Sequence, residues 1–166
     1  IKSGLVLIHQ QRAHERILYE HYLKMQDKEG PSQQLIFPKT VELSPSDIAI
    51  VKTISDELLN MGFRFDYLNK NSIVVMGTPT DVEMEKLESV MEELVEQFKT
   101  ESSIEKHDKL SRSLAKTMSI KSGRKLNPDE MRSIIDNLFA CQIPNTTAQG
   151  KPTLITLTLE ELAKKF

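Results

Sequence analysis

The stretch Gly4-Leu-Val-Leu-Ile-His-Gln-Gln-Arg-Ala-His-Glu-Arg-Ile-Leu-Tyr-Glu20 decides how the fold begins. Its apolar run, Leu5 to Ile8, predicts a buried strand, because it is rich in branched residues and far too short to cross a membrane. Helix-forming residues follow His9 and predict a helix over 11–25. A strand-to-helix junction therefore falls at 9–15, and α/β proteins commonly place functional side chains at such junctions.

The composition is that of an ordinary globular chain. It has 166 residues, 39% hydrophobic and 28% charged, which suits one domain or two small subdomains and excludes the disordered and membrane classes. A net charge of −2 argues against strong autonomous DNA binding, which requires cations that neutralise phosphates. Because Cys141 is the single cysteine, we expect neither an internal disulfide nor a zinc-thiolate cluster, and a cytoplasmic setting. The missing initiator methionine leads us to expect an excised fragment.

The rest of the chain predicts a mixture of helices and strands. The expected elements are an edge strand at 33–43, a helix at 45–61, strands at 63–67 and 72–76, a helix reaching 98, helices at 104–118 and 128–139, a strand at 153–156 and a last short helix. Capping pairs are expected at Thr80 with Glu83 and at Thr158 with Glu161, and Asn127 before Pro128 marks another helix start. Residues 44–98 therefore form a helix, strand, strand, helix insert.

The motif at 9–20 resembles the C-terminal domain of the MutL family of DNA mismatch-repair proteins. Nuclease-competent members of that family carry D-Q-H-A-x-x-E-x-x-x-x-E at this junction. Gln10, Glu15 and Glu20 match the motif. The aspartate, histidine and alanine positions hold His9, Gln11 and Arg12.

Two further segments resemble the other metal-site motifs of the family. Residues 115–123 resemble A-C-x-x-A-I-K/R-A-G, with Lys116 at the cysteine position. Residues 147–153 resemble C-P-H-G-R-P-T, with Thr147 and Gln149 at the cysteine and histidine positions. Amides and hydroxyls are poor metal ligands, and an ammonium group repels a divalent cation. We therefore expect a degenerate endonuclease site, no bound metal or other cofactor, and no catalysis by this domain.

The resemblance also implies an architecture and a function. It implies an α+β fold in which a discontinuous α/β dimerisation subdomain, 1–43 and 104–166, carries an external or regulatory lobe, 44–103. It further implies dimerisation, with itself or a paralogue, of a protein whose ATPase lies upstream. Other mismatch-repair proteins are implied as partners, DNA is contacted weakly or through the full-length protein, and a membrane is not involved. Two alternatives stay open: a divergent metal-dependent DNA-nicking endonuclease that uses His9 and Glu15, with His14 beside them, and an unrelated α/β interaction domain.

A second functional segment is expected at 33–38. Gln33, Leu35, Ile36, Phe37 and Pro38 resemble the Q-x-hydrophobic-hydrophobic-x-P segment by which these domains contact the replication sliding clamp. Proline belongs at a sheet edge, where an extended segment can present apolar anchors to a partner. The alternative is that the apolar residues are simply strand core.

Two charged sets have surface interpretations. Lys109, Arg112 and Lys116 follow one side of the helix at 104–118 and could contact phosphates, although such a stripe is also typical of a solvated face. Glu20 stands four residues after Arg16, a spacing that predicts an exposed helix pair as an alternative to a metal ligand.

Overall fold

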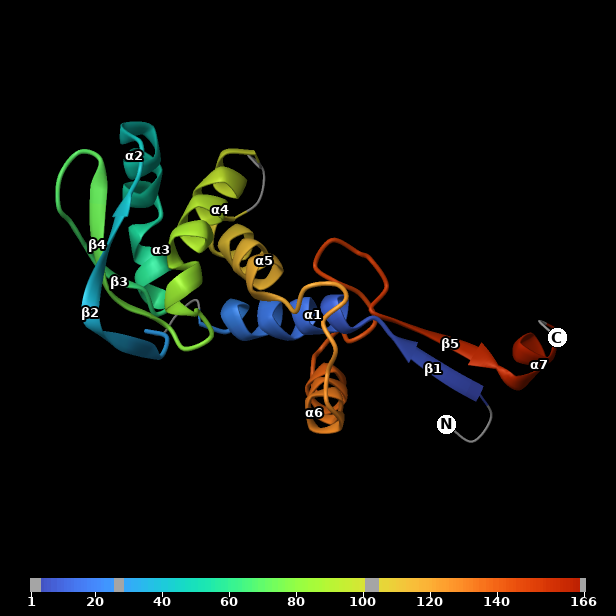
Figure 1. Cartoon of the computed structure of the whole chain (residues 1–166). Helices are drawn as coiled ribbons and strands as arrows, with labels where there is room; N and C mark the ends of the chain where they lie inside the picture. Colours follow the sequence, from blue (N-terminus) through green and yellow to red (C-terminus); the bar gives the residue numbers. More distant parts are fainter. Residues whose placement is uncertain (1–3, 26–28, 101–104, 165–166) are drawn as a thin grey trace. The chain divides into compact units, whose positions relative to one another are not determined.

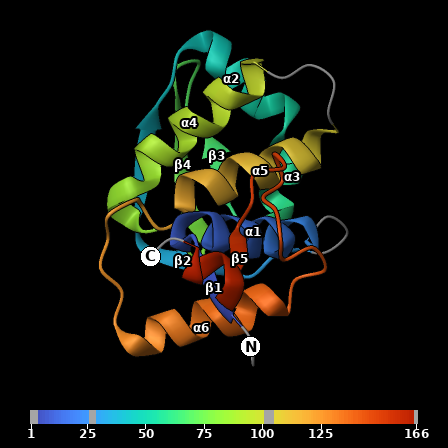
Figure 2. The same ribbon diagram turned by 90° about the vertical axis from the view of Figure 1, so that its right-hand side faces the viewer.

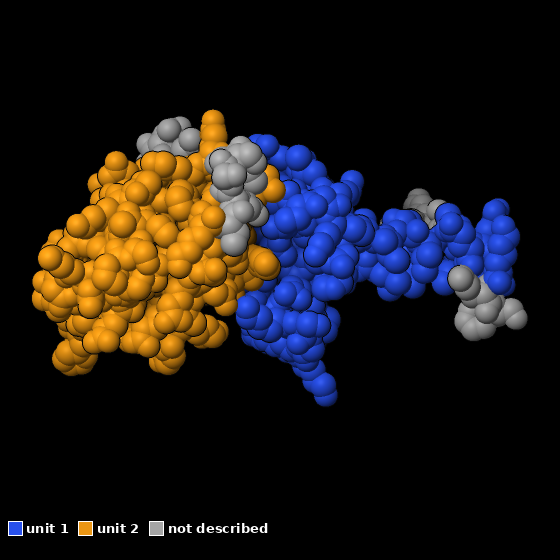
Figure 3. Space-filling view, turned by 90° about the horizontal axis from the view of Figure 1, so that it is seen from above, with its two compact units in different colours: residues 1–20, 119–166 blue, residues 21–118 orange. Residues whose placement is uncertain are grey.

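The structure is a computed structural model that describes residues 4–25, 29–100 and 105–164. It divides into two compact units, which are coloured separately in Figure 3. Unit 1 combines 1–20 with 119–166, and unit 2 is 21–118. Helix α1 (Gln10–Leu23) crosses the boundary, so that its first part through Glu20 belongs to unit 1.

Unit 1 is built on a two-stranded antiparallel ribbon (Figure 1). Strand β1 (Gly4–Ile8) pairs with β5 (Leu154–Thr158), and Leu7 lies opposite Ile155. The first turns of α1 follow β1 directly, as the sequence predicted, and α7 (Leu159–Ala163) follows β5. Helix α6 (Pro128–Phe139) lies beside β1 in Figures 1 and 2.

The core of unit 1 forms where α1 meets α6. Ala13, Ile134 and Leu138 are buried there, with Ile8 and Leu154 of the ribbon packed against them. Local sequence signals set the ends of the helices. The capping boxes at Asn127 with Glu130 and at Thr158 with Glu161 are both present, which confirms those two helix starts.

Unit 2 contains a three-stranded antiparallel sheet in the order β2-β4-β3, with helices gathered on one face (Figure 1). The strands are β2 (Ser32–Glu42), β3 (Arg64–Tyr67) and β4 (Ser72–Pro79). The helices are α2 (Pro45–Thr53), α3 (Ser55–Asn60), the 3-10 helix η1 (Met84–Lys86), α4 (Leu87–Thr100) and α5 (Lys106–Met118). Strand β2 occupies a sheet edge, as predicted.

Two helix predictions in unit 2 are wrong in detail. The helix expected over 45–61 is two helices, because the backbone leaves the helical conformation at Ile54, which is fully buried. The capping box expected at Thr80 and Glu83 does not form. Residues 80 and 81 lie in a turn, buried Val82 follows it, and helical structure begins only at Met84.

The fold class, a mixture of helices and small antiparallel sheets, is confirmed as α+β. The unit boundaries differ from the expected 1–43, 44–103 and 104–166, because β2 pairs with β4 and α5 packs along α4. Both elements therefore belong to unit 2, together with residues 44–103, although they were expected to belong to the dimerisation subdomain. In the described ranges, no helix has the length and apolar character needed to cross a bilayer.

Candidate functional site

The first motif begins at His9, the residue between β1 and α1. Its backbone N–H donates to the Thr153 carbonyl at 2.8 Å, which ties the end of β1 to the end of the third motif. Its carbonyl accepts from the Ala13 N–H at 2.9 Å, and its Nδ1 accepts from the Arg12 N–H at 3.4 Å. The backbone carbonyl and the imidazole of His9 therefore both accept hydrogen bonds from N–H groups in the first turn of α1.

Two neighbouring side chains of the motif hold backbone carbonyls. The amide Nε2 of Gln10 donates to the Arg124 carbonyl at 2.6 Å, just after the second motif segment. The Arg12 guanidinium donates to the Pro152 carbonyl at 3.1 Å, inside the third. The retained Gln10 and the substituted Arg12 therefore both donate hydrogen bonds to backbone carbonyls of distant segments, and Arg12 places a cation where the family motif has alanine.

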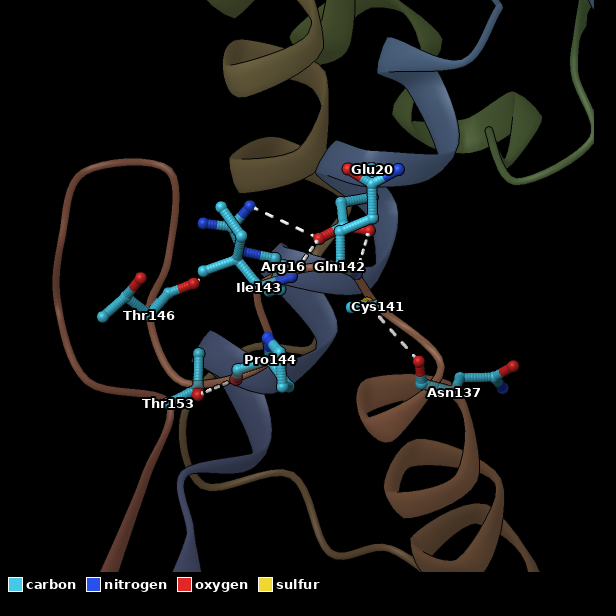
Figure 4. Close-up of polar contacts among 9 residues, drawn as sticks. All are labelled: Arg16, Glu20, Asn137, Cys141, Gln142, Ile143, Pro144, Thr146 and Thr153. Atoms are coloured by element: carbon cyan, nitrogen blue, oxygen red, sulfur yellow. Dashed lines mark hydrogen bonds and ion pairs between the residues drawn. The ribbon is translucent and has the colours of Figure 1, made fainter.

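The retained Glu20 anchors the loop that carries the third motif (Figure 4). Its carboxylate accepts from the Gln142 N–H at 2.8 Å and from the Ile143 N–H at 3.1 Å. Arg16 Nη1 lies 3.6 Å from the same carboxylate, and Arg16 Nε donates to the Thr146 carbonyl. Glu20 and Arg16 are 7% and 5% exposed, so the predicted surface pair is wrong: the pair is buried and joins α1 to the loop.

The third motif closes its own turn. The buried Thr147 hydroxyl accepts from the Lys151 N–H at 3.2 Å, and the Thr147 carbonyl accepts from the Gly150 N–H at 3.0 Å. Gly150 has a φ of +80°, a conformation that favours glycine. Gln149 is exposed at the tip. Threonine therefore supports the loop by hydrogen bonding where the family motif places a cysteine.

The donor set does not fit a zinc or manganese site. Such sites need thiolate, imidazole or carboxylate ligands that converge on one point. The Nδ1 of His14 already accepts from the Ile120 N–H at 3.0 Å, and Gln11 offers only an amide. Lys116 is an exposed ammonium on α5, in unit 2. Throughout 4–25, 29–100 and 105–164, no three His, Cys, Asp or Glu side chains are grouped as metal ligands.

The segment expected to contact the sliding clamp forms a bulge on the edge strand β2. The β2–β4 register shifts between Gln34 and Lys39, so the residues between them leave the regular ladder. Leu35 points inward and is 7% exposed, whereas Ile36 and Phe37 are 89% and 79% exposed. The strand-core interpretation therefore holds for Leu35 alone. Gln33 keeps its place in the ladder opposite Thr78, and Pro38 is exposed.

The basic stripe on α5 is not a continuous surface. Lys109 is 5% exposed, its ammonium donates to the Phe98 carbonyl, and it lies 4.3 Å from the centre of the Phe98 ring. Arg112 pairs with Asp108 at 2.7 Å. Lys116 is the exposed member of the predicted set. The prediction that Lys109 contacts phosphates is wrong, because its charge is directed into unit 2.

Unit 1 exposes apolar residues on the ribbon and on α6, so the expectation that Leu5 to Ile8 form a buried strand is wrong: the strand forms, but one of its faces is exposed. On the ribbon, Leu5, Leu7 and Ile155 are each between 44% and 50% exposed and lie on one face. On α6, the exposed apolar residues are Met131, Ile135 and Phe139. A sequence signal existed, because α6 has more apolar positions than one core-facing stripe needs.

Comparison with known proteins places the chain in a family. The profile of the MutL C-terminal dimerisation domain matches residues 2–126. The DNA mismatch repair protein MutL of Flavobacterium psychrophilum is 40% identical over 170 aligned residues, which cover 100% of this chain and 28% of that protein. Those of Chloroherpeton thalassium and Chlorobium phaeobacteroides are 39% and 35% identical, again over the whole chain and 27% of each relative. The chain therefore spans little more than a quarter of these relatives, and it belongs to the MutL C-terminal dimerisation domain family.

Proposed function

We propose that this chain is the homodimerising C-terminal domain of a DNA mismatch-repair protein. The observation that carries the proposal is the exposed apolar surface of unit 1, on the ribbon and on α6. A two-stranded ribbon is marginally stable by itself, and exposed apolar patches of this kind mark protein interfaces. Membership of a family of dimerisation domains supports a second copy as the partner.

Light scattering after size exclusion tests the dimer. We expect the mass of the purified chain at micromolar concentration to be twice the monomer mass of 19.0 kDa. A monomer across the accessible concentration range would refute homodimerisation and favour a paralogue as the partner. The proposal extends to the whole protein: its contacts with other mismatch-repair proteins and with DNA would be made through the full-length chain.

We further propose that the domain has no endonuclease site of its own. The argument is chemical, because Gln11, Thr147 and Gln149 stand at ligand positions and Thr147 is engaged within its loop. Incubation with supercoiled plasmid and manganese should therefore produce no nicked product. Nicking that disappears in Glu15→Ala, or in His9→Ala, would establish the divergent nuclease instead.

We also propose that the bulge at 33–38 docks on the replication sliding clamp. Ile36 and Phe37 are large apolar side chains that project into solvent from an edge strand, and such side chains lose little by moving into a partner's pocket. The free edge of β2 can supply backbone hydrogen bonds at the same time. Burial of Leu35 fixes the base of the bulge, so the two exposed side chains are presented from a defined backbone.

A paired substitution tests clamp docking. Gln33→Ala combined with Ile36→Ala should abolish binding to immobilised clamp while leaving the unfolding transition unchanged, because both residues are exposed. Gln34→Ala is the matched control, since Gln34 is also exposed and lies at the unspecified position of the motif. Unchanged clamp affinity in the double variant would refute the docking proposal without touching the dimer proposal.

A further inference from the structure

Helix α6 presents an apolar stripe along its outer side. Met131, Ile135 and Phe139 follow one another at intervals of four residues, so they lie on one face of the helix. They are 50%, 42% and 56% exposed, while Ile134 and Leu138 on the inner face are 8% and 0% exposed. The helix therefore has one apolar side for its own core and a second that the described residues of unit 1 leave about half exposed.

The exposed stripe continues into a pocket. A cavity of about 240 Å³ lies between β1 and α6, and Val6, Ile8, Met131 and Ile135 are among its lining residues. Its walls are mostly apolar side chains, so it offers a site for an apolar group from outside the unit. An incoming aromatic side chain at the Met131 end of the stripe would reach this pocket.

We propose that α6 is the two-fold seam of the homodimer, with α6 of a second copy packed antiparallel against it and Ile135 facing Ile135 of the partner subunit. The inference rests on the proposed homodimer and specifies its surface. In this register Met131 lies beside Phe139 of the partner subunit, because the positions are symmetric about Ile135. Each Phe139 is then placed to enter the pocket on the other copy, as an anchor residue does in a protein interface.

The charges beside the stripe complement one another in this register. Arg132 and Asp136 are both exposed and share one flank of the stripe. With Ile135 on the axis, Arg132 of one copy and Asp136 of the partner subunit are separated by about 3 Å along the helix axis, because the rise is about 1.5 Å per residue. The two-fold axis generates a second, identical pair on the other side of Ile135 along the helix. A self-complementary pattern of this kind is what an isologous interface requires, so a second copy is the occupant we commit to.

Site-directed cross-linking tests the seam. In a Cys141→Ser background, which removes the native thiol, Ile135→Cys should be captured almost completely as a covalent dimer by a short bismaleimide. Leu7→Cys, on the exposed face of the ribbon and away from the proposed two-fold axis, is the comparison and should cross-link with a clearly lower yield than Ile135→Cys. Light scattering on the same samples separates two failures. A dimer that cross-links through Leu7→Cys alone overturns the α6 seam and leaves the homodimer standing, whereas a monomer overturns both.

A charge swap provides a second test. Arg132→Asp alone brings like charges together twice in the interface and should raise the dissociation constant of the dimer roughly tenfold. Asp136→Arg should have the same effect. The double variant restores opposite charges across the axis and should recover most of the affinity. Both positions are exposed, so all three variants are expected to fold. Equal dissociation constants across the series, or no recovery in the double variant, would overturn the antiparallel register.

Discussion

Glu20 on α1 holds Gln142, with 2.8 Å between the carboxylate Oε2 and the backbone nitrogen. A residue of the first motif thereby fixes the entry to the loop that carries the third motif. The same carboxylate accepts from Ile143 and lies near the Arg16 guanidinium, so all of these partners depend on one buried negative charge. Direct polar contacts therefore join the helix of the first motif to the loop that carries the third.

Replacement of Glu20 should destabilise the domain strongly. Glu20→Ala leaves the Arg16 guanidinium and two backbone N–H groups without their acceptor in a buried setting, which costs about 3–5 kcal/mol for a broken buried ion pair. Urea unfolding followed by circular dichroism measures the loss. Glu92→Ala, which removes an exposed carboxylate from α4, should change the free energy of unfolding by less than about 0.5 kcal/mol. Equal effects of the two variants would show that the Glu20 contacts contribute nothing to stability.

The buried and the exposed residues of the bulge on β2 should differ in their contribution to stability. Leu35→Ala removes a buried side chain and should lower the free energy of unfolding by about 2–4 kcal/mol, because it leaves a cavity. Ile36→Ser combined with Phe37→Ser should leave that free energy nearly unchanged, since both side chains are already in solvent. Thermal unfolding of the two variants makes the comparison. A destabilised double variant would mean that these side chains are packed in solution.

Local chemistry explains which parts of the fold could be predicted from the sequence. The helix start at Asn127 depends on residues within one turn, and the edge position of 33–43 depends on the missing N–H of Pro38. Both features could therefore be predicted from the sequence. The break at Ile54 and the late helix start at Met84 depend on how buried neighbours pack in unit 2, which no local pattern specifies.

The same division applies to the candidate site. The substituted ligand positions could be identified directly, because ligand chemistry depends on residue type. The burial of Glu20 and Lys109 could not, because a charged residue in a helix is usually exposed and its burial depends on distant partners, the loop at 141–146 and the Phe98 carbonyl.

Lys109 should behave as a structural residue and not as a DNA contact. Lys109→Ala removes the hydrogen bond to the Phe98 carbonyl and the cation over the Phe98 ring, and should destabilise the chain by about 1–3 kcal/mol. Lys116→Ala changes an exposed lysine on the same helix and should cost less than about 0.5 kcal/mol. Chemical unfolding at neutral pH checks both values. A stable Lys109→Ala variant with weaker DNA binding would reinstate the phosphate-contact interpretation.

The ion pair between Asp47 and Lys99 should give unit 2 a pH-dependent contribution to stability. The two atoms lie 2.8 Å apart, and hydrogen bonds from Lys99 and then Ser44 hold the pKa of the Asp47 carboxyl below its ordinary value of 3.8. Hydrogen bonding to Asp47 and Glu96 raises the pKa of Lys99 above 10.5. The pair therefore stabilises the folded state between these two ordinary values.

The sign of the effect follows from these directions. A carboxyl whose pKa is lowered by folding contributes stability above its unfolded pKa, and the contribution is lost as the pH falls through the lower folded pKa. Asp47→Asn should therefore have a lower urea midpoint than the native chain at pH 7, and the difference should shrink toward zero as the pH falls well below about 4. Asp66→Asn, which removes an exposed carboxylate on β3, is the control and should show no such convergence. A midpoint difference for Asp47→Asn that stays constant from neutral to acid pH would mean that the ion pair does not form in solution.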